Sequence, residues 1–122
     1  MTTSIRAVRG ATTVDADTPE QVTLRVQELL DAMIRRNDLC NDDMVSIVFT
    51  ATSDVVSMFP AAAARTMGLG DVPLMCAREL DVIGSTPRCI RVMMHVSTGR
   101  TRDQIHHVYL HDANGLRDDL PG

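Results

Sequence analysis

The stretch Arg88–Ser97 (RCIRVMMHVS) constrains the fold most, because it predicts a long strand that is apolar on both faces. Successive residues of a strand point to opposite faces. Four apolar residues therefore share one face: Ile90, Val92, Met94 and Val96. Met93 makes the other face apolar as well. A sheet built around this strand needs cover on both sides.

Only one segment predicts a long helix that could cover the sheet. It begins with Thr18 as N-cap, Pro19 in the first turn and Gln21 placed to complete a capping box. Asn37 suits its C-terminal end. Its apolar residues fall on one stripe at helical spacing: Val22, Val26, Leu29, Leu30, Met33 and Ile34. One helix covers one face, so a symmetry-related copy of the chain is the simplest cover for the second face.

The rest of the chain predicts short strands separated by turns, without repeats, linkers or low-complexity segments. In the second strand, Val45, Ile47 and Phe49 are expected to share a face. Gly10 would allow a tight turn after the first strand, and Gly68 would end a short helix. We expect these strands at Ser4–Gly10, Met44–Thr52, Val72–Met75 and His106–His111, and the short helix at Pro60–Met67.

The length and composition fit one domain that gains stability by assembly. The 122 residues predict an α+β domain, with a mixed sheet of about five strands packed on one long helix and a flexible tail at 115–122. The chain has two Phe, one Tyr and no Trp, so its core lacks the side chains that bury most surface. Oligomerisation is one way to recover that burial.

Charge and residue types exclude several classes of function. The net charge of −4 argues against a nucleic acid or an anionic membrane as partner. All twelve basic residues are Arg, so an anion site must use planar guanidinium groups, and Schiff-base or pyridoxal chemistry lacks its lysine. Cys40, Cys76 and Cys89 lack CxxC spacing, and the N-terminus lacks an apolar signal segment. We therefore expect a cytoplasmic protein.

Two arginines within predicted strands are the first candidate site residues, because P-loop, GxGxxG, HExxH and GxSxG motifs are missing. Arg9 ends the first strand, and Arg91 interrupts the apolar run of the long strand. An Arg on a packed sheet face needs an anion or carboxylate partner, although an Arg at a strand end can also reach solvent.

Glu79 and Cys76 are further candidates, with a surface carboxylate and a buried structural thiol as the plain alternatives. The four His residues do not repeat at a metal-ligand spacing, so no metal site is predicted. The residues alone thus indicate a small oligomeric domain with an arginine-lined anion site, and they do not name a reaction.

Several segments, taken in order, resemble the small trimeric chorismate mutases of the Bacillus type. The shared motifs are VRGATTV (Val8–Val14), Phe59-Pro60-Ala61 with Arg65, Cys76 with Glu79 and Asp81, CIRVMM (Cys89–Met94), DQIHHVYL (Asp103–Leu110), and Leu116-Arg117 with Asp119-Leu120. They run through most of the chain and are specific as a set. The chain departs from the family pattern at Ala62, where a Lys is expected, and at Met75, where a smaller polar residue is expected.

The resemblance implies an isomerase that rearranges chorismate to prephenate in Phe and Tyr biosynthesis, without cofactor or metal. It also implies a homotrimer whose sheets form a pseudo-α/β barrel, with active sites in the clefts between subunits. Two alternatives from other classes are a non-catalytic, arginine-lined trimer that binds a metabolite, and a structural trimer without a defined substrate.

The resemblance also assigns roles to site residues. Arg91 would donate to the ether oxygen of chorismate and to a carboxylate, while Arg9 and Tyr109 would hold a carboxylate. Glu79 and Cys76 would contact the ring hydroxyl. The remaining substrate-binding residues would come from the facing subunit (Phe59 and Arg65), from a loop that contacts substrate partly through its backbone (Met75, Ala77 and Arg78 of Met75–Glu79), and from the tail (Leu116 and Arg117).

Overall fold

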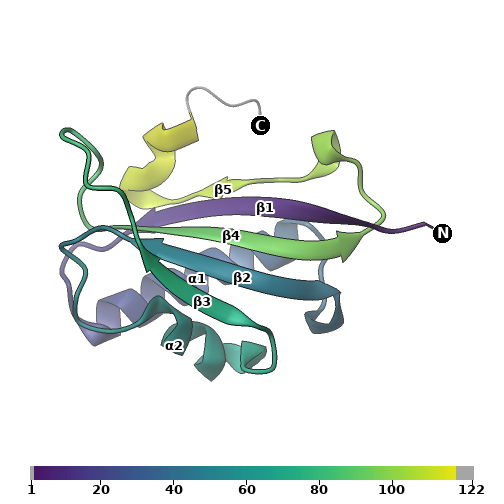
Figure 1. Cartoon of the computed structure of the whole chain (residues 1–122), viewed down its shortest axis with the longest axis horizontal. Helices are drawn as coiled ribbons and strands as arrows, with labels where there is room; N and C mark the ends of the chain where they lie inside the picture. Colours follow the sequence, from purple (N-terminus) through teal and green to yellow (C-terminus); the bar gives the residue numbers. More distant parts are fainter. Residues whose placement is uncertain (1, 118–122) are drawn as a thin grey trace.

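One mixed sheet of five strands organises residues 2–117, which are the residues that the computed structural model describes (Figure 1). The sheet order is β3-β2-β4-β1-β5. β4 pairs antiparallel with β1 and β2, while the outer pairs β2·β3 and β1·β5 are parallel. The strands are β1 (Ser4–Thr13), β2 (Met44–Ala51), β3 (Leu74–Arg78), β4 (Cys89–Thr98) and β5 (Val108–Tyr109). The predicted α+β class with a mixed five-stranded sheet is confirmed.

Helix α1 (Pro19–Arg36) lies behind the sheet in Figure 1, and the short α2 (Pro60–Ala64) packs against α1. A π-helical segment (Arg65–Leu69) continues α2. Residues 2–117 also contain three 3₁₀ helices: Asn41–Asp43, Arg102–Gln104 and η4 (His111–Arg117). The first three residues of the segment predicted as a tail, 115–117, are therefore the last turn of η4. Residues 118–122 of that segment lie outside the described part, and its flexibility stays a prediction. Among residues 2–117, no helix is both long and apolar enough to span a bilayer.

The predicted contact between α1 and one face of the sheet is confirmed. The helix begins after Thr18, whose hydroxyl accepts from the Gln21 N–H at 3.2 Å, and ends at Asn37. The capping box is only half formed, because the Gln21 amide oxygen accepts from the Asp15 N–H instead of from Thr18. The apolar stripe packs against the apolar face of β4, and these side chains are fully or almost fully buried: Val22, Val26, Leu29, Leu30, Met33, Ile90, Val92, Met94 and Val96.

Gly10 does not form the predicted turn, since β1 continues through it to Thr13. A Cβ atom on Gly10 would lie 2.5 Å from Met33 Sδ and 3.1 Å from a methyl group of Leu29. The glycine therefore lets the backbone of β1 approach α1 closely. A glycine in the interior of a strand often marks such a close approach of another segment.

The prediction that Val45 shares a face with Ile47 and Phe49 is wrong, because a β-bulge interrupts the pairing of β2 with β4. Met44 pairs with Val96 and Ser46 pairs with His95, which leaves Val45 as the extra residue. Met44 is buried as a result, whereas Val45 is exposed. Ile47 and Phe49 follow the prediction and are fully buried.

The opposite face of the sheet, which we call the front face, has little cover in residues 2–117. η4 packs against the end of this face near Ala11 and Cys89. Beyond it, Arg91 is exposed and Met93 retains 37% of its accessible surface. The uncovered second face that the sequence predicts is present in the chain.

Candidate active site

Five of the predicted site residues, Leu116 among them, meet in one hollow on the front face, which we call the front hollow. Arg9 comes from β1, Arg91 from β4 and Tyr109 from β5, while Glu79 follows the last residue of β3. The hollow has a volume of about 320 Å³ and is completed by Gly10, Ala11, Val48, Thr50, Val92, Met93 and Leu116. Strand register explains the grouping, because Ala11 and Thr50 both pair with Arg91, and Ala11 pairs with Tyr109.

Glu79 is fixed on two sides within the front hollow. Its N–H donates to the Ala51 carbonyl at 3.0 Å, which continues the β2–β3 pairing by one residue. Its carboxylate Oε2 accepts from Thr50 Oγ1 at 2.7 Å and lies 3.4 Å from Arg91 Nε. The carboxylate and the guanidinium therefore enter the hollow as a neighbouring pair. Sequence reasoning missed Thr50, whose only signal is that it shares a strand face with Val48.

Arg9 lies in a different electrostatic setting from Arg91. Its backbone N–H donates to His107 Nδ1 at 2.9 Å, and its guanidinium forms no ion pair with any carboxylate of residues 2–117. Burial lowers the pKa of His107, and the charges of Arg9 and His106 lower it further. A neutral His107 can accept this hydrogen bond. The Arg9 guanidinium, which lacks a carboxylate partner among residues 2–117, is available for an anion in the hollow.

Cys76 does not share the front hollow with Glu79 of its own chain. β3 spans Leu74–Arg78, so the segment predicted as a loop from Met75 onward is a strand, and alternation places Cys76 beside Phe49 on the core side. Cys76 packs against the core and lines a second hollow of about 450 Å³ together with Phe59, Ala77 and Arg78. We call this the Phe59 hollow.

One wall of the Phe59 hollow is fixed by hydrogen bonds from the Arg78 side chain to backbone carbonyls. Arg78 Nη1 donates to the Thr52 carbonyl at 2.7 Å and to the Val55 carbonyl at 3.4 Å. Phe59 itself remains 72% exposed. Arg65 and Met75 are also exposed and line neither hollow. The single chain thus divides most of the predicted residues between two hollows and leaves Arg65 and Met75 outside both.

Helix η4 supplies one further wall of the front hollow. Leu116 lies in η4 and packs against Ala11, Cys89 and Ala113. Burial raises the pKa of the Cys89 thiol, so this cysteine stays protonated. The Arg117 side chain, predicted to close over the site, lies outside the described part of the structure. No group of three or more His, Cys, Asp or Glu side chains within residues 2–117 is arranged to hold a metal ion.

Known proteins are similar to this chain in both sequence and fold. The chorismate mutase type I family matches residues 5–120. Proteins named chorismate mutase AroH from Thermus thermophilus and from Bacillus subtilis (strain 168) are each 44% identical over 117 residues, which is 95% of this chain and 96% and 92% of theirs. A solved chorismate mutase from Clostridium thermocellum superposes with a TM-score of 0.89 at 48% identity, covering 90% of this chain and 98% of its own. The chain therefore belongs to the chorismate mutase type I family.

Proposed function

We propose that this chain rearranges chorismate to prephenate by holding the substrate against the guanidinium groups of the front hollow. Chorismate mutase activity, an isomerase reaction of aromatic amino acid biosynthesis, is the activity of the family to which the chain belongs. The observation that carries the residue assignment is the meeting of Arg9, Glu79, Arg91 and Tyr109 in one hollow.

The reaction requires neither a nucleophile nor an acid–base pair. It is intramolecular: one C–O bond of chorismate breaks while one C–C bond forms, and no proton leaves the substrate. The protein must hold the compact conformer in which the two reacting ends meet. It must also stabilise the negative charge that develops on the ether oxygen, and only stabilisation that is larger in the transition state than in the ground state accelerates the reaction.

Arg91 is assigned to the ether oxygen. A guanidinium presents a planar fork of donors that can serve this oxygen and a carboxylate together. Glu79, lying 3.4 Å from Arg91 Nε and held by Thr50, limits the orientations open to that fork and is assigned to the ring hydroxyl. Arg9, without an acid partner among the described residues, is assigned with Tyr109 to a substrate carboxylate.

The remaining residues are proposed to act from a neighbouring copy in a homotrimer. Cys76 and Phe59 line the Phe59 hollow whereas Glu79 lines the front hollow, and we therefore assign Cys76 and Glu79 of one site to different subunits. Exposed apolar side chains lie in and around the same region, as expected for a subunit interface: Val56, Phe59, Leu80, Val82 and Ile83. β3 is an edge strand, so backbone groups of Met75–Arg78 are available to substrate. Leu116 and Arg117 are proposed to close the site.

Subunit mixing tests this assignment. Sedimentation should give a mass about three times 13.4 kDa. Arg91→Ala and Arg65→Ala chains should each be nearly inactive alone, as followed by the loss of chorismate ultraviolet absorbance without added cofactor. Unfolded and refolded together in equal amounts, they should recover about one quarter of the wild-type rate, because one interface in four then combines two intact halves.

The matched control mixes Arg91→Ala with Glu79→Ala. Both residues belong to the same half of the proposed site, so every interface carries one damaged front hollow and no activity should return. Recovery in this control, or none in the Arg91 and Arg65 mixture of folded trimers, would contradict the division of the site between subunits. Binding of chorismate without turnover by the wild-type protein would favour a metabolite-binding trimer instead.

A further inference from the structure

The turn that leads from β5 into η4 passes through a strained residue, which is the first residue of η4. His111 has φ of 54°, in the left-handed region that side chains with a Cβ rarely adopt. The turn matters because η4 carries Leu116 into the front hollow. A conformation of this kind persists only where the surrounding contacts hold it.

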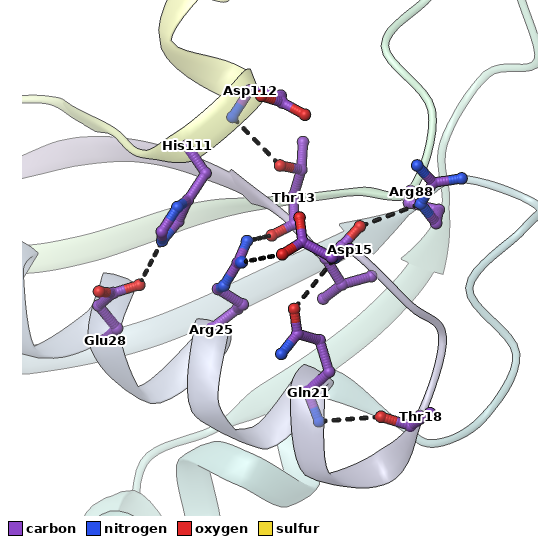
Figure 2. Close-up of polar contacts among 10 residues, drawn as sticks. Thr13, Asp15, Thr18, Gln21, Arg25, Glu28, Arg88, His111 and Asp112 are labelled. Atoms are coloured by element: carbon purple, nitrogen blue, oxygen red, sulfur yellow. Dashed lines mark hydrogen bonds and ion pairs between the residues drawn. The ribbon is translucent and has the colours of Figure 1, made fainter.

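Two contacts hold the first residues of η4, one to α1 and one to β1 (Figure 2). His111 Nε2 lies 2.7 Å from Glu28 Oε1 of α1. The Asp112 N–H donates to Thr13 Oγ1 of β1 at 3.2 Å. The His111 and Glu28 side chains are 37% and 48% exposed, so water can replace their contact when either is removed.

The same region of α1 also fixes the end of β1. Arg25, 8% exposed, donates from Nη1 to the Thr13 carbonyl and pairs through Nη2 with Asp15 Oδ2 at 2.9 Å (Figure 2). Thr13 is therefore held by α1 on its carbonyl side while its hydroxyl holds Asp112. Arg25, Asp15 and Asp112 are the charged groups around the Glu28–His111 contact in this region. α1 thus reaches η4 directly through Glu28 and indirectly through Thr13.

The geometry of a 3₁₀ helix carries this anchoring to the hollow. Side chains three residues apart are aligned on such a helix, so Ala113 and Leu116 face the same way. Ala113 is fully buried against Ala11 and Cys89, and Leu116 packs beside it and lines the front hollow. A tilt of η4 away from the sheet about its first residues therefore withdraws Leu116 from the front hollow.

We propose that Glu28 and His111 are positioning residues for the reaction: their contact holds η4 against the sheet and keeps Leu116 as a wall of the front hollow. The inference rests on the proposed function, because it assigns a substrate to that hollow. Neither residue touches the hollow, so their effect is on how well substrate is retained and not on the charge that stabilises its transition state.

The test is a double-mutant cycle with Glu28→Ala, His111→Asn and the double variant. Asn tolerates the left-handed conformation, so the second variant removes the contact without adding strain. Each single variant should raise KM about two- to fivefold, the size expected for loss of one partly exposed hydrogen bond, with a smaller change in kcat. The double variant should be no worse than the poorer single variant, since both remove the same contact. Amide exchange of Asp112 and Ala113 should accelerate in all three.

Asp31→Ala is the matched control, because Asp31 pairs with Arg35 on the same helix at 2.8 Å and that pair is not in contact with η4. It should leave KM and η4 exchange unchanged. Additive effects of Glu28→Ala and His111→Asn, unchanged η4 exchange, or faster exchange with wild-type KM would each overturn the proposal. Absence of turnover in the wild-type protein would instead refute the proposed function, whereas amide exchange would still decide whether the contact holds η4.

Discussion

The two faces of β4 are built from alternating residues of one strand, yet they differ in burial, charge and hydrogen bonding. Behind the strand, Ile90, Val92, Met94 and Val96 are at most 3% exposed and pack into the core with α1. In front, Arg91 is exposed beside a carboxylate, Met93 is partly exposed and His95 meets Ser46 Oγ at 3.1 Å. The back face contributes burial, whereas the front face contributes charge and hydrogen bonding.

This difference indicates that residues that stabilise the fold and residues proposed to act in catalysis alternate along the ten residues of β4. Burial stabilises roughly in proportion to apolar area, so the back face should decide the free energy of unfolding. Electrostatic stabilisation depends on where a charge points, so the front face should decide the rate. Substitutions on the two faces should therefore change different measured quantities.

The neighbouring residues Met93 and Met94 provide the sharpest test, since they are the same residue type on opposite faces. Met94→Ala leaves a cavity in the core and should lower the free energy of unfolding by about 2–5 kcal/mol, measured by urea denaturation. Met93→Ala should change the stability of the chain itself by less than about 0.5 kcal/mol. If the front face packs in the proposed trimer, Met93→Ala should also make unfolding more dependent on protein concentration. Equal losses in both variants, independent of concentration, would contradict the comparison.

Arg91→Lys should have the largest effect on the rate. It keeps the positive charge but removes the planar fork, and a compact ammonium cannot serve the ether oxygen and a carboxylate together. By analogy with removal of one oxyanion donor, kcat should fall by about 10²–10³, roughly 3–4 kcal/mol. KM should change less, because Arg9 and Tyr109 still hold a carboxylate.

The melting temperature of Arg91→Lys should stay close to that of the wild-type protein, because a partly exposed front-face residue supports little of the core. Near-normal kcat in a folded trimer would remove Arg91 from the role assigned to it. A large loss of stability would show that the front face also holds the fold, which would break the comparison of the two faces.

The parts of the fold that follow from periodicity could be predicted from the sequence. The stripe of α1 and the faces of β4 depend only on residue spacing, and both are confirmed. That Arg9 and Arg91 share one sheet face depends in addition on the β1–β4 register, which pairs Arg9 with Met93 and which residue spacing alone does not fix. The roles of these residues stay predictions, as do the homotrimer and the cytoplasmic location.

Features set by tertiary contacts could not be predicted in this way. The bulge at Val45 changes which residues of β2 are buried, and Gly10 is required by the position of Met33, which is distant in sequence. Cys76 lies on the core side because β3 runs further than its apolar residues suggest. The burial of Arg25 likewise depends on the end of β1, whose Thr13 carbonyl accepts a hydrogen bond from its guanidinium.

A smaller effect is expected at Asp17, which lies on neither face. Its carboxylate accepts from the Val56 N–H at 2.9 Å and the Ser57 N–H at 3.2 Å, and so holds the loop that leads to Phe59. Asp17→Asn should raise KM about threefold, the size of one weakened hydrogen bond, if Phe59 contacts substrate bound to a neighbour. Asp71→Asn, which removes an exposed carboxylate without a hydrogen bond among the described residues, is the control.

The pH dependence of Asp17 gives this prediction a second readout. The backbone hydrogen bond from Val56, followed by the hydrogen bond from Ser57, lowers its pKa below the ordinary 3.8. A lowered pKa means that the stabilisation is present above pH 3.8 and is lost as pH falls through the folded-state value. The wild-type protein and Asp17→Asn should therefore converge in stability in strong acid. A constant difference down to pH 2 would show that the carboxylate charge is not what holds the loop.

The smallest expected effect is that of pH on the rate of the folded enzyme. The reaction transfers no proton, so kcat should stay nearly flat between about pH 6 and 9, and a bell-shaped profile with two steep limbs would indicate acid–base chemistry. Stability should be flat between about pH 6.5 and 9 for a separate reason. The pKa of His107 is lowered from 6.5, so the unfolded chain takes up the proton first and stability falls only as pH drops below about 6.5. The pKa of Cys89 is raised from 9.0, so the unfolded thiol ionises first and stability falls only above about pH 9.

His107→Gln retains an acceptor for the Arg9 N–H and should abolish the acid-side loss of stability while leaving the rate profile flat. Melting curves and kcat measured across this pH range, for the wild-type protein and this variant, therefore separate a pH effect on the fold from one on the chemistry.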